Sequence, residues 1–184
     1  MATGHLHIEA APDTIVTLPS DARSRPTLIH IGAMTVGSAA GPTKTLQMSN
    51  DVSDISGYRI LQTGGLHDDD VEYTASCTPV LTCESLIEEF ATNAGAMDEV
   101  VCTGITATWQ FGAYYSASDL ETIRRIIGRM YHRAVDGTET LISEISQDIT
   151  TTLTSYTKTS TVTSAWATNE RVVIKWYAYF EVEV

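Results

Sequence analysis

The last fifteen residues alternate between apolar and polar side chains, and this pattern constrains the fold more than any other in the chain. From Glu170 to Val184 one set of alternate positions is apolar, comprising Val172, Ile174, Trp176, Ala178, Phe180, Val182 and Val184. A period of two residues is typical of a β-strand with one buried face. At ~3.3 Å per residue, a strand of these fifteen residues would be roughly 50 Å long, so we expect it to pair or pack beyond one small sheet. The pattern predicts a β-rich, assembly-prone protein.

Length and composition indicate one globular domain. The chain has 184 residues, 43% of them hydrophobic, and no break in composition divides it. This is long enough for a single domain with its own core. Residues 1–26, which hold Pro12, Pro19 and Pro26 among small and polar residues, are expected to form an extended arm. Residues 27–184 are expected to form the β-rich domain.

The chain is acidic, yet it carries few charged residues. Its formal net charge is −12, while only 18% of its residues are charged. The negative charge argues against sequence-independent binding along nucleic-acid phosphates, although an acidic wall past which DNA slides stays open. Much of the polar surface must be uncharged, and β-branched threonines suit exposed strand faces. They crowd one stretch, at Thr150, Thr151, Thr152, Thr154, Thr157, Thr159, Thr161 and Thr163.

Short apolar runs between turn signals predict further strands at residues 27–36, 44–48, 58–62, 71–76 and 100–115. A helix is predicted near 83–94, because Thr82 is a suitable N-cap and Gly95 a suitable end. A second helix is predicted over 119–134. Its start is marked by a Ser-x-x-Glu capping box, and its apolar positions keep helical spacing, at Leu120, Ile123, Ile126, Ile127, Met130 and Ala134.

The remaining segments complete the expected fold. Residues 139–154 are ambiguous, and their first half is interpreted as helical from apolar residues at every fourth position. Residues 157–164 are expected to form a hairpin with the terminal strand through a turn at 166–169. The predicted fold class is mainly β with flanking helices (α+β), a β-sandwich or barrel packed by one or two helices.

Basic residues concentrate on the predicted second helix, at Arg124, Arg125, Arg129 and Arg133. One interpretation is a solvated face whose arginines pair with nearby carboxylates. Another is a docking surface for an acidic patch on a neighbouring copy, since the planar guanidinium binds carboxylates bidentately. A phosphate or nucleic-acid site is a third interpretation, which the negative surroundings and the limited aromatic interleaving disfavour. Together with Trp176, Tyr177 and Tyr179, these arginines are the predicted subunit interface.

Aromatic residues leave a different class of function open. Strand alternation favours packing in a core or an interface, while a carbohydrate or ligand cleft is the alternative. The residues concerned are Trp109, Trp166, Trp176, Tyr114, Tyr115, Tyr177 and Tyr179.

No catalytic, metal or cofactor site is predicted, and the chain is not expected to be an enzyme. His5 and His7 lack a third ligand, and the acidic run 67–70 lacks the spacing of a calcium loop. No Gly-x-Ser-x-Gly motif positions a nucleophile, and His132 is interpreted as a surface histidine. Neither a membrane span nor a signal peptide is expected. The cysteines are expected to be buried free thiols, with a Cys77–Cys83 disulfide as the alternative.

An acidic, Ser/Thr-rich β domain with a proline-punctuated arm and a long terminal strand resembles the structural proteins of tailed-phage virions. The strand at 71–76 followed by a helix from Cys83 is similar to the plan of a tail-tube subunit. The resemblance implies a β-sandwich or barrel with a flanking helix, assembled into hexameric rings whose sheets line a lumen. A second helix from Ser118 departs from that plan and leaves capsid decoration or a neck connector open. The implied partners are copies of the chain and other virion proteins, assembled in a host cytoplasm, with DNA at most passing an acidic lumen.

Overall fold

The computed structural model describes residues 2–8, 28–31, 34–36, 44–63, 71–77, 82–98, 100–114 and 121–182. Within these ranges every regular element is a β-strand, so the expectation of a mainly β protein is confirmed. In chain order the strands are β1 (Ala2–Ile8), β2 (Leu28–Ile31), β3 (Met34–Val36), β4 (Lys44–Val52), β5 (Arg59–Thr63), β6 (Val71–Cys77), β7 (Thr82–Thr92), β8 (Val101–Tyr114), β9 (Glu121–Arg133), β10 (Glu139–Asp148), β11 (Thr154–Ala165) and β12 (Arg171–Val182).

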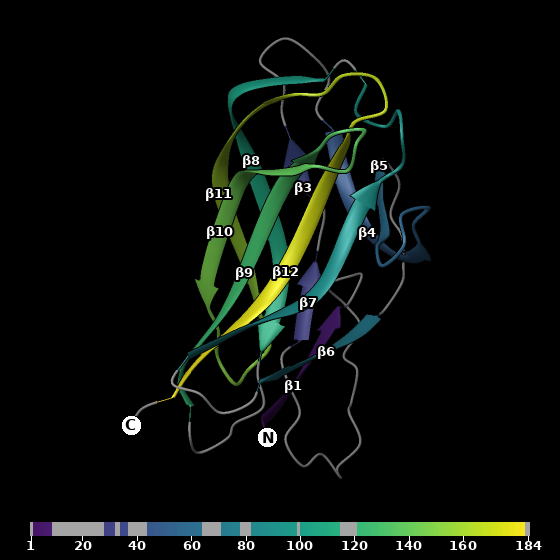
Figure 1. Ribbon diagram of the computed structural model, residues 1–184. Coiled ribbons are helices and arrows are strands. Elements are labelled where there is room, and N and C mark those ends of the chain that lie inside the picture. Colours follow the sequence, from purple (N-terminus) through teal and green to yellow (C-terminus); the bar gives the residue numbers. More distant parts are fainter. Residues whose placement is uncertain are drawn as a thin grey trace.

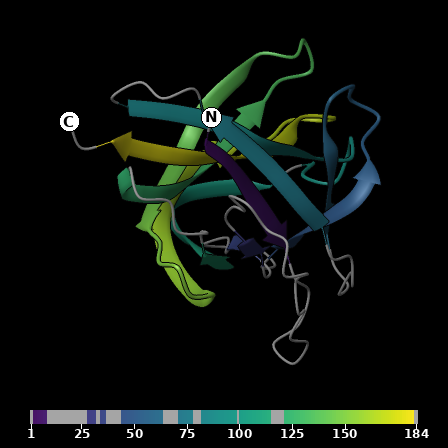
Figure 2. The ribbon, with the colours of Figure 1, turned by 90° about the horizontal axis from the view of Figure 1, so that it is seen from below.

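Ten of these strands form one sheet, in the order β10-β9-β12-β7-β5-β4-β3-β8-β11, with β2 also paired to β8. β5 and β7 are parallel, and the other described pairs in this sheet are antiparallel. The end strands β10 and β11 lie side by side (Figure 1), and from below the strands surround a common interior (Figure 2). The sheet therefore curls into two facing layers, with β10, β9, β12 and β7 opposite β11, β8, β3 and β4.

Side-chain hydrogen bonds join the two end strands of this sheet. The Ser143 hydroxyl on β10 donates to the Ser160 hydroxyl on β11 at 2.6 Å. Ser160 also accepts the indole N–H of Trp109 at 2.7 Å. Unpaired sheet edges invite pairing with other chains, and here the two edge strands lie against each other at this contact.

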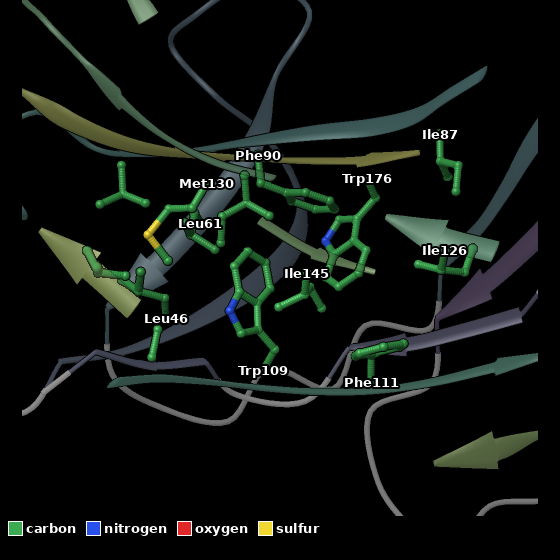
Figure 3. Close-up of a cluster of buried hydrophobic side chains, with 14 of the residues drawn as sticks. Leu46, Leu61, Ile87, Phe90, Trp109, Phe111, Ile126, Met130, Ile145 and Trp176 are labelled. Atoms are coloured by element: carbon green, nitrogen blue, oxygen red, sulfur yellow. The ribbon is translucent and has the colours of Figure 1, made fainter. Parts of the chain in front are cut away.

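Two tryptophans from opposite layers fill the centre of the core (Figure 3). Trp109 on β8 meets Trp176 on β12 edge to face, with ring centroids 5.7 Å apart and planes at 88°. Gly128 on β9 faces both rings, and a Cβ built there would lie 2.9 Å from Trp176 and 3.0 Å from Trp109. Glycine is required at this position because the indoles occupy the space of any larger side chain.

The predicted terminal strand is confirmed as β12. Its alternate positions are buried as expected, with Val172 and Ile174 fully buried and Trp176 and Ala178 nearly so. The predicted hairpin with residues 157–164 is wrong, since β12 pairs with β7 and β9 while β11 pairs with β8. The intervening residues instead cross from one layer to the other.

The predicted helices 83–94 and 119–134 are wrong, because the structure places β7 and β9 there. In β9 the inward positions Ile126, Gly128 and Met130 follow a period of two, and Ile126 and Met130 are fully buried. Spacings of three and four residues matched a helix in part because Ile127, on the outer face, is apolar too, and it is buried there. The helix expected in the first half of 139–154 is likewise a strand, β10.

Gly137 ends β9 through a hairpin turn instead of ending a helix. It adopts a left-handed conformation with φ of 93°. Its N–H donates to the carbonyl of Ala134, and the Asp136 carboxylate accepts the N–H of Thr138 at 2.8 Å. Asp-Gly is a common hairpin-turn sequence, so the correct signal was present. Of the predicted arm, residues 2–8 form β1, which pairs with β6, and residues 9–26 lie outside the described residues.

Gly128→Ala is expected to destabilise the fold by about 1–3 kcal/mol, because the added methyl group must displace both indoles from a close-packed core. Urea denaturation followed by tryptophan fluorescence measures the change. Ser146→Ala, at an exposed position on neighbouring β10, is the matched control and should change stability by less than about 0.5 kcal/mol. Equal stability of the Gly128→Ala variant and the unmodified protein would contradict the packing described here.

Candidate interaction surface

The layer formed by β7, β12, β9 and β10 presents a continuous outer surface of cations and tyrosines. Strand alternation places five of the predicted interface residues there, namely Arg125, Arg129, Arg133, Tyr177 and Tyr179. We call this surface the cation–tyrosine face. Its members are Tyr58, Glu84, Glu89, Arg125, Arg129, Tyr131, Arg133, Glu139, Glu144, Asp148, Lys175, Tyr177 and Tyr179.

The other two predicted interface residues lie on the inner side of the same strands. Arg124 is 4% exposed, and Trp176 is 1% exposed in the core. A helix would have grouped Arg124 with the other arginines, but in a strand successive side chains point to opposite faces. For the five residues on the outer face, a role at a subunit interface stays a prediction.

Arg129 is bonded to carboxylates on two strands. Its Nε donates to Glu144 on β10 at 2.6 Å, and its Nη2 donates to Glu84 on β7 at 3.0 Å. The hydrogen bond with Glu84, followed by that with Glu144, raises the pKa of Arg129. Four residues before Arg129 on β9, Arg125 donates from Nε to Asp148 on β10 at 2.7 Å. These bonds fix long side chains in one arrangement across the layer.

A second cluster surrounds Lys175. Its ammonium group lies 2.8 Å from carboxylate oxygens of both Glu89 and Glu139. Glu139 also accepts hydrogen bonds from Arg133 and from the Tyr58 hydroxyl, each at 2.7 Å. Burial raises the pKa of Glu139, but the bonds from Lys175, Tyr58 and Arg133 outweigh it, so the pKa lies below its usual value. Burial likewise opposes the charge of Lys175, yet its carboxylate partners raise its pKa.

Cations also lie over the tyrosine rings. The guanidinium carbon of Arg129 is 4.6 Å from the ring centroid of Tyr177, and that of Arg125 is 5.6 Å from Tyr179. The Lys175 ammonium lies 5.4 Å from the Tyr58 centroid and 5.5 Å from that of Tyr131. These distances are within the range of cation–π attraction. Each ring therefore has a cation against one of its faces.

Among the described side chains that make up the cation–tyrosine face, positive and negative charges almost cancel. Its five carboxylates, from Glu84, Glu89, Glu139, Glu144 and Asp148, oppose four cations, from Arg125, Arg129, Arg133 and Lys175, which leaves one negative charge. The whole chain carries −12. The arginines are thus paired within the chain, as the solvated-face interpretation anticipated, and they need no acidic neighbour to balance them.

His132 belongs to a separate polar cluster that the sequence did not reveal. Its Nδ1 lies 3.0 Å from the Ser164 hydroxyl, and its Nε2 lies 2.9 Å from Glu170. The Ala167 N–H and then His132 lower the pKa of the Glu170 carboxyl. The imidazole also packs on Trp166, with centroids 5.6 Å apart. The Ala167 N–H donates to the Glu170 carboxylate within the turn between β11 and β12. The contact of Glu170 with His132 therefore links this turn to β9.

The aromatic residues considered for a cleft are dispersed. Trp109 and Trp166 are buried, with 1% and 2% exposure, and Trp176 packs against Trp109. Tyr114 is half-buried, and Tyr115 lies outside the described residues. A shallow pocket of about 230 Å³ elsewhere is lined by Ile60, Leu61, Gln62, Thr63, Asn93 and Ala96. It gathers neither tyrosines nor tryptophans.

The remaining candidates are described only in part. Among the described residues, no group of three or more His, Cys, Asp or Glu side chains is arranged to hold a metal ion. The run 67–70 and the side chains of His5, His7, Cys77 and Cys83 lie outside them. Cys102 is a buried free thiol, and burial raises its pKa. The described part of the chain also contains no helix capable of spanning a membrane.

Comparison with known proteins assigns no family. No protein-family model matches the chain, and no curated protein matches it. It matches one solved structure, described as "CBM4 structure and function", at 10% sequence identity and a TM-score of 0.19. That match covers 55% of this chain and 80% of the other. Similarity this weak carries no argument about fold or function.

The surroundings of Tyr58 and Tyr131 predict that their phenol groups ionise at a higher pH than an ordinary tyrosine. Burial raises the pKa of Tyr58 and of Tyr131 to about 12, assisted by hydrogen bonds with Glu139 and Tyr177 respectively. Since the folded state holds these protons more tightly than the unfolded chain, their stabilising contribution is complete below pH 10 and is lost as the pH rises toward 12. Absorbance at 295 nm should show phenols that ionise near pH 12, and Tyr58→Phe and Tyr131→Phe should each remove one of them. Titration of every tyrosine near pH 10 while circular dichroism still reports a folded chain would contradict this environment.

Proposed function

We propose that this chain is a structural virion protein that assembles with copies of itself into a ring, tube or lattice, and most specifically a tail-tube subunit of a tailed phage. The observation that carries the proposal is the cation–tyrosine face. It combines half-buried arginines and tyrosines on the outer side of one layer, and these residue types are enriched at protein interfaces and among their strongest contacts.

The ion pairs prepare this face for a partner in two ways. They reduce its net charge to near zero, so that a second acidic copy can approach it without strong repulsion. They also fix the arginine and lysine side chains before any contact forms. Because ordering such side chains costs about 0.5–1.5 kcal/mol each on association, a face ordered in advance binds more favourably.

The curled sheet supports the same function. Its end strands are linked through Ser143 and Ser160, so open-ended strand addition is hindered at that seam. Subunits of this kind can fold as monomers and then join through faces and loops. The large negative charge of the chain suits a lumen wall that does not hold passing DNA. Capsid decoration and a neck connector are the alternatives within the same class.

A ligand- or carbohydrate-binding module is the second candidate, favoured by the gathering of Tyr58, Tyr131, Tyr177 and Tyr179, all half-buried, on the outer side of one layer. Sugar rings bind aromatic side chains by stacking on an open ring face. Here a cation lies against one face of each ring, at 4.6 Å for Tyr177. This arrangement leaves less open aromatic surface for a sugar, so we rank the assembly function first.

Replacing the tyrosines of β12 tests the proposal. The double variant Tyr177→Ser/Tyr179→Ser should form far fewer multimers than the unmodified protein, measured by native mass spectrometry and negative-stain imaging. Tyr177→Phe/Tyr179→Phe keeps the rings and should assemble to a similar extent. Thermal melting controls for folding, with both double variants expected to remain folded at the assay temperature. Multimers that form equally well in the serine variant would remove the cation–tyrosine face from the assembly.

A glycan-binding experiment distinguishes the ligand-binding module from the assembly function. Glycan-array screening of the unmodified protein should give no signal above background under the assembly proposal. A monomer that binds one glycan, and loses that binding in the serine variant, would instead favour the ligand-binding module.

A further inference from the structure

The opposite layer of the sandwich carries a second exposed surface of very different chemistry. We call it the threonine face and define it by the outward side chains of β11 and β8: Ser155, Thr157, Thr159, Thr161, Thr106, Thr108 and Gln110. All are exposed except Thr108, which is half-buried. The sequence had indicated an exposed threonine-rich strand here, but not its partner strand.

Strand register makes this face regular. Thr159 pairs with Thr108, Thr161 with Thr106, and Thr157 with Gln110. Hydroxyl and amide groups are thus set out in rows across the two paired strands.

The threonine face contains no charged side chain among its members. Alternation places Lys158, the one charged residue within β11, on the opposite side of the strand, where it is paired with the inward-facing Trp109 position. For a chain with a net charge of −12, most approaches between copies bring like charges together. The threonine face and the nearly neutral cation–tyrosine face avoid that repulsion.

The two faces are chemically suited to each other. Threonine and glutamine side chains both donate and accept hydrogen bonds, so they can add hydrogen bonds to the carboxylates and tyrosine hydroxyls of the cation–tyrosine face, whose ion pairs stay in place. Threonine methyl groups also offer apolar contact to aromatic rings, as they do between paired strands. Stacked sheets pack about 10 Å apart, a spacing that side chains of this size fill.

The two faces point in opposite directions, because β8 and β11 lie in one layer while β9 and β12 lie in the other (Figure 1). We propose that the threonine face of one copy packs against the cation–tyrosine face of the next, in a head-to-tail contact. Such a heterologous contact generates a ring when its rotation closes and a filament when it does not. This inference rests on the proposed function and names the subunit contact through which it operates.

Two variants, each defective in one face, test the head-to-tail contact. Thr159→Glu/Thr161→Glu places two carboxylates on the threonine face, and Tyr177→Ser/Tyr179→Ser removes the rings from the other face. Each variant alone should associate at least roughly a hundredfold more weakly than the unmodified protein, since unpaired charges or lost anchors are expensive at a contact. Thr159→Ser/Thr161→Ser is the matched control and should still assemble.

Mixing the two defective variants gives the decisive readout. Each retains the face that the other lacks, so the mixture should form heterodimers of one copy of each and nothing larger, as seen by native mass spectrometry with one variant isotopically labelled. If the tyrosine variant alone forms two-fold dimers, the threonine face binds itself and the head-to-tail contact is wrong. Normal multimers from the glutamate variant would overturn this inference while leaving the proposed function intact. An unmodified protein that stays monomeric throughout would overturn both.

Discussion

Trp109, Trp176 and Gly128 meet where the two layers of the sheet face each other. Their contact joins the two layers at the centre of the core, and Gly128 fits there because it has no side chain. The same contact holds Trp176 of β12 directly opposite Gly128 of β9. A slip of one residue would turn every side chain of a strand to the other face. The core therefore sets the register of β9 against β12, and with it the chemistry of the outer surface.

The outer surface follows from that register. With Trp176 opposite Gly128, Lys175 pairs with Arg129 and Tyr179 with Arg125 in the strand ladder. The cations reach carboxylates on the flanking strands β7 and β10, and they lie over tyrosine rings. On the opposite layer, the register of β11 with β8 forms rows of threonine. The proposed assembly requires both surfaces, one nearly neutral by compensation and the other by lack of charge.

The fold could be predicted from the sequence wherever the apolar residues clearly followed the two-residue period of a strand and did not also match the spacing of a helix. The alternation from Arg171 to Val182 identified β12 and the buried positions Val172, Ile174, Trp176 and Ala178, although Val173, on the other side of the strand, is buried as well. In β9 the outward Ile127 is also buried, so the apolar pattern matched a helix as well as a strand. In β7, Glu84, Glu88 and Glu89 favour a helix locally, but pairing with β12 and β5 prevails. Local propensity cannot reveal such pairing, because the partners are distant in sequence.

The candidate surface was predictable only in outline. The sequence marked Arg125, Arg129 and Arg133 as unusual in an acidic chain, and it marked Tyr177 and Tyr179 as their companions. It could not show that Arg129 binds Glu84, which lies 45 residues earlier, since that contact depends on three-dimensional register. For the same reason it placed Arg124 among the surface arginines, although strand alternation buries it.

Whether the unmodified protein assembles with itself can be measured by native mass spectrometry combined with negative-stain imaging across protein and salt concentration. We expect rings, tubes or closed multimers that grow with protein concentration, with sixfold symmetry for a tail tube and threefold symmetry for a decoration protein. A monodisperse monomer under every condition would contradict self-assembly.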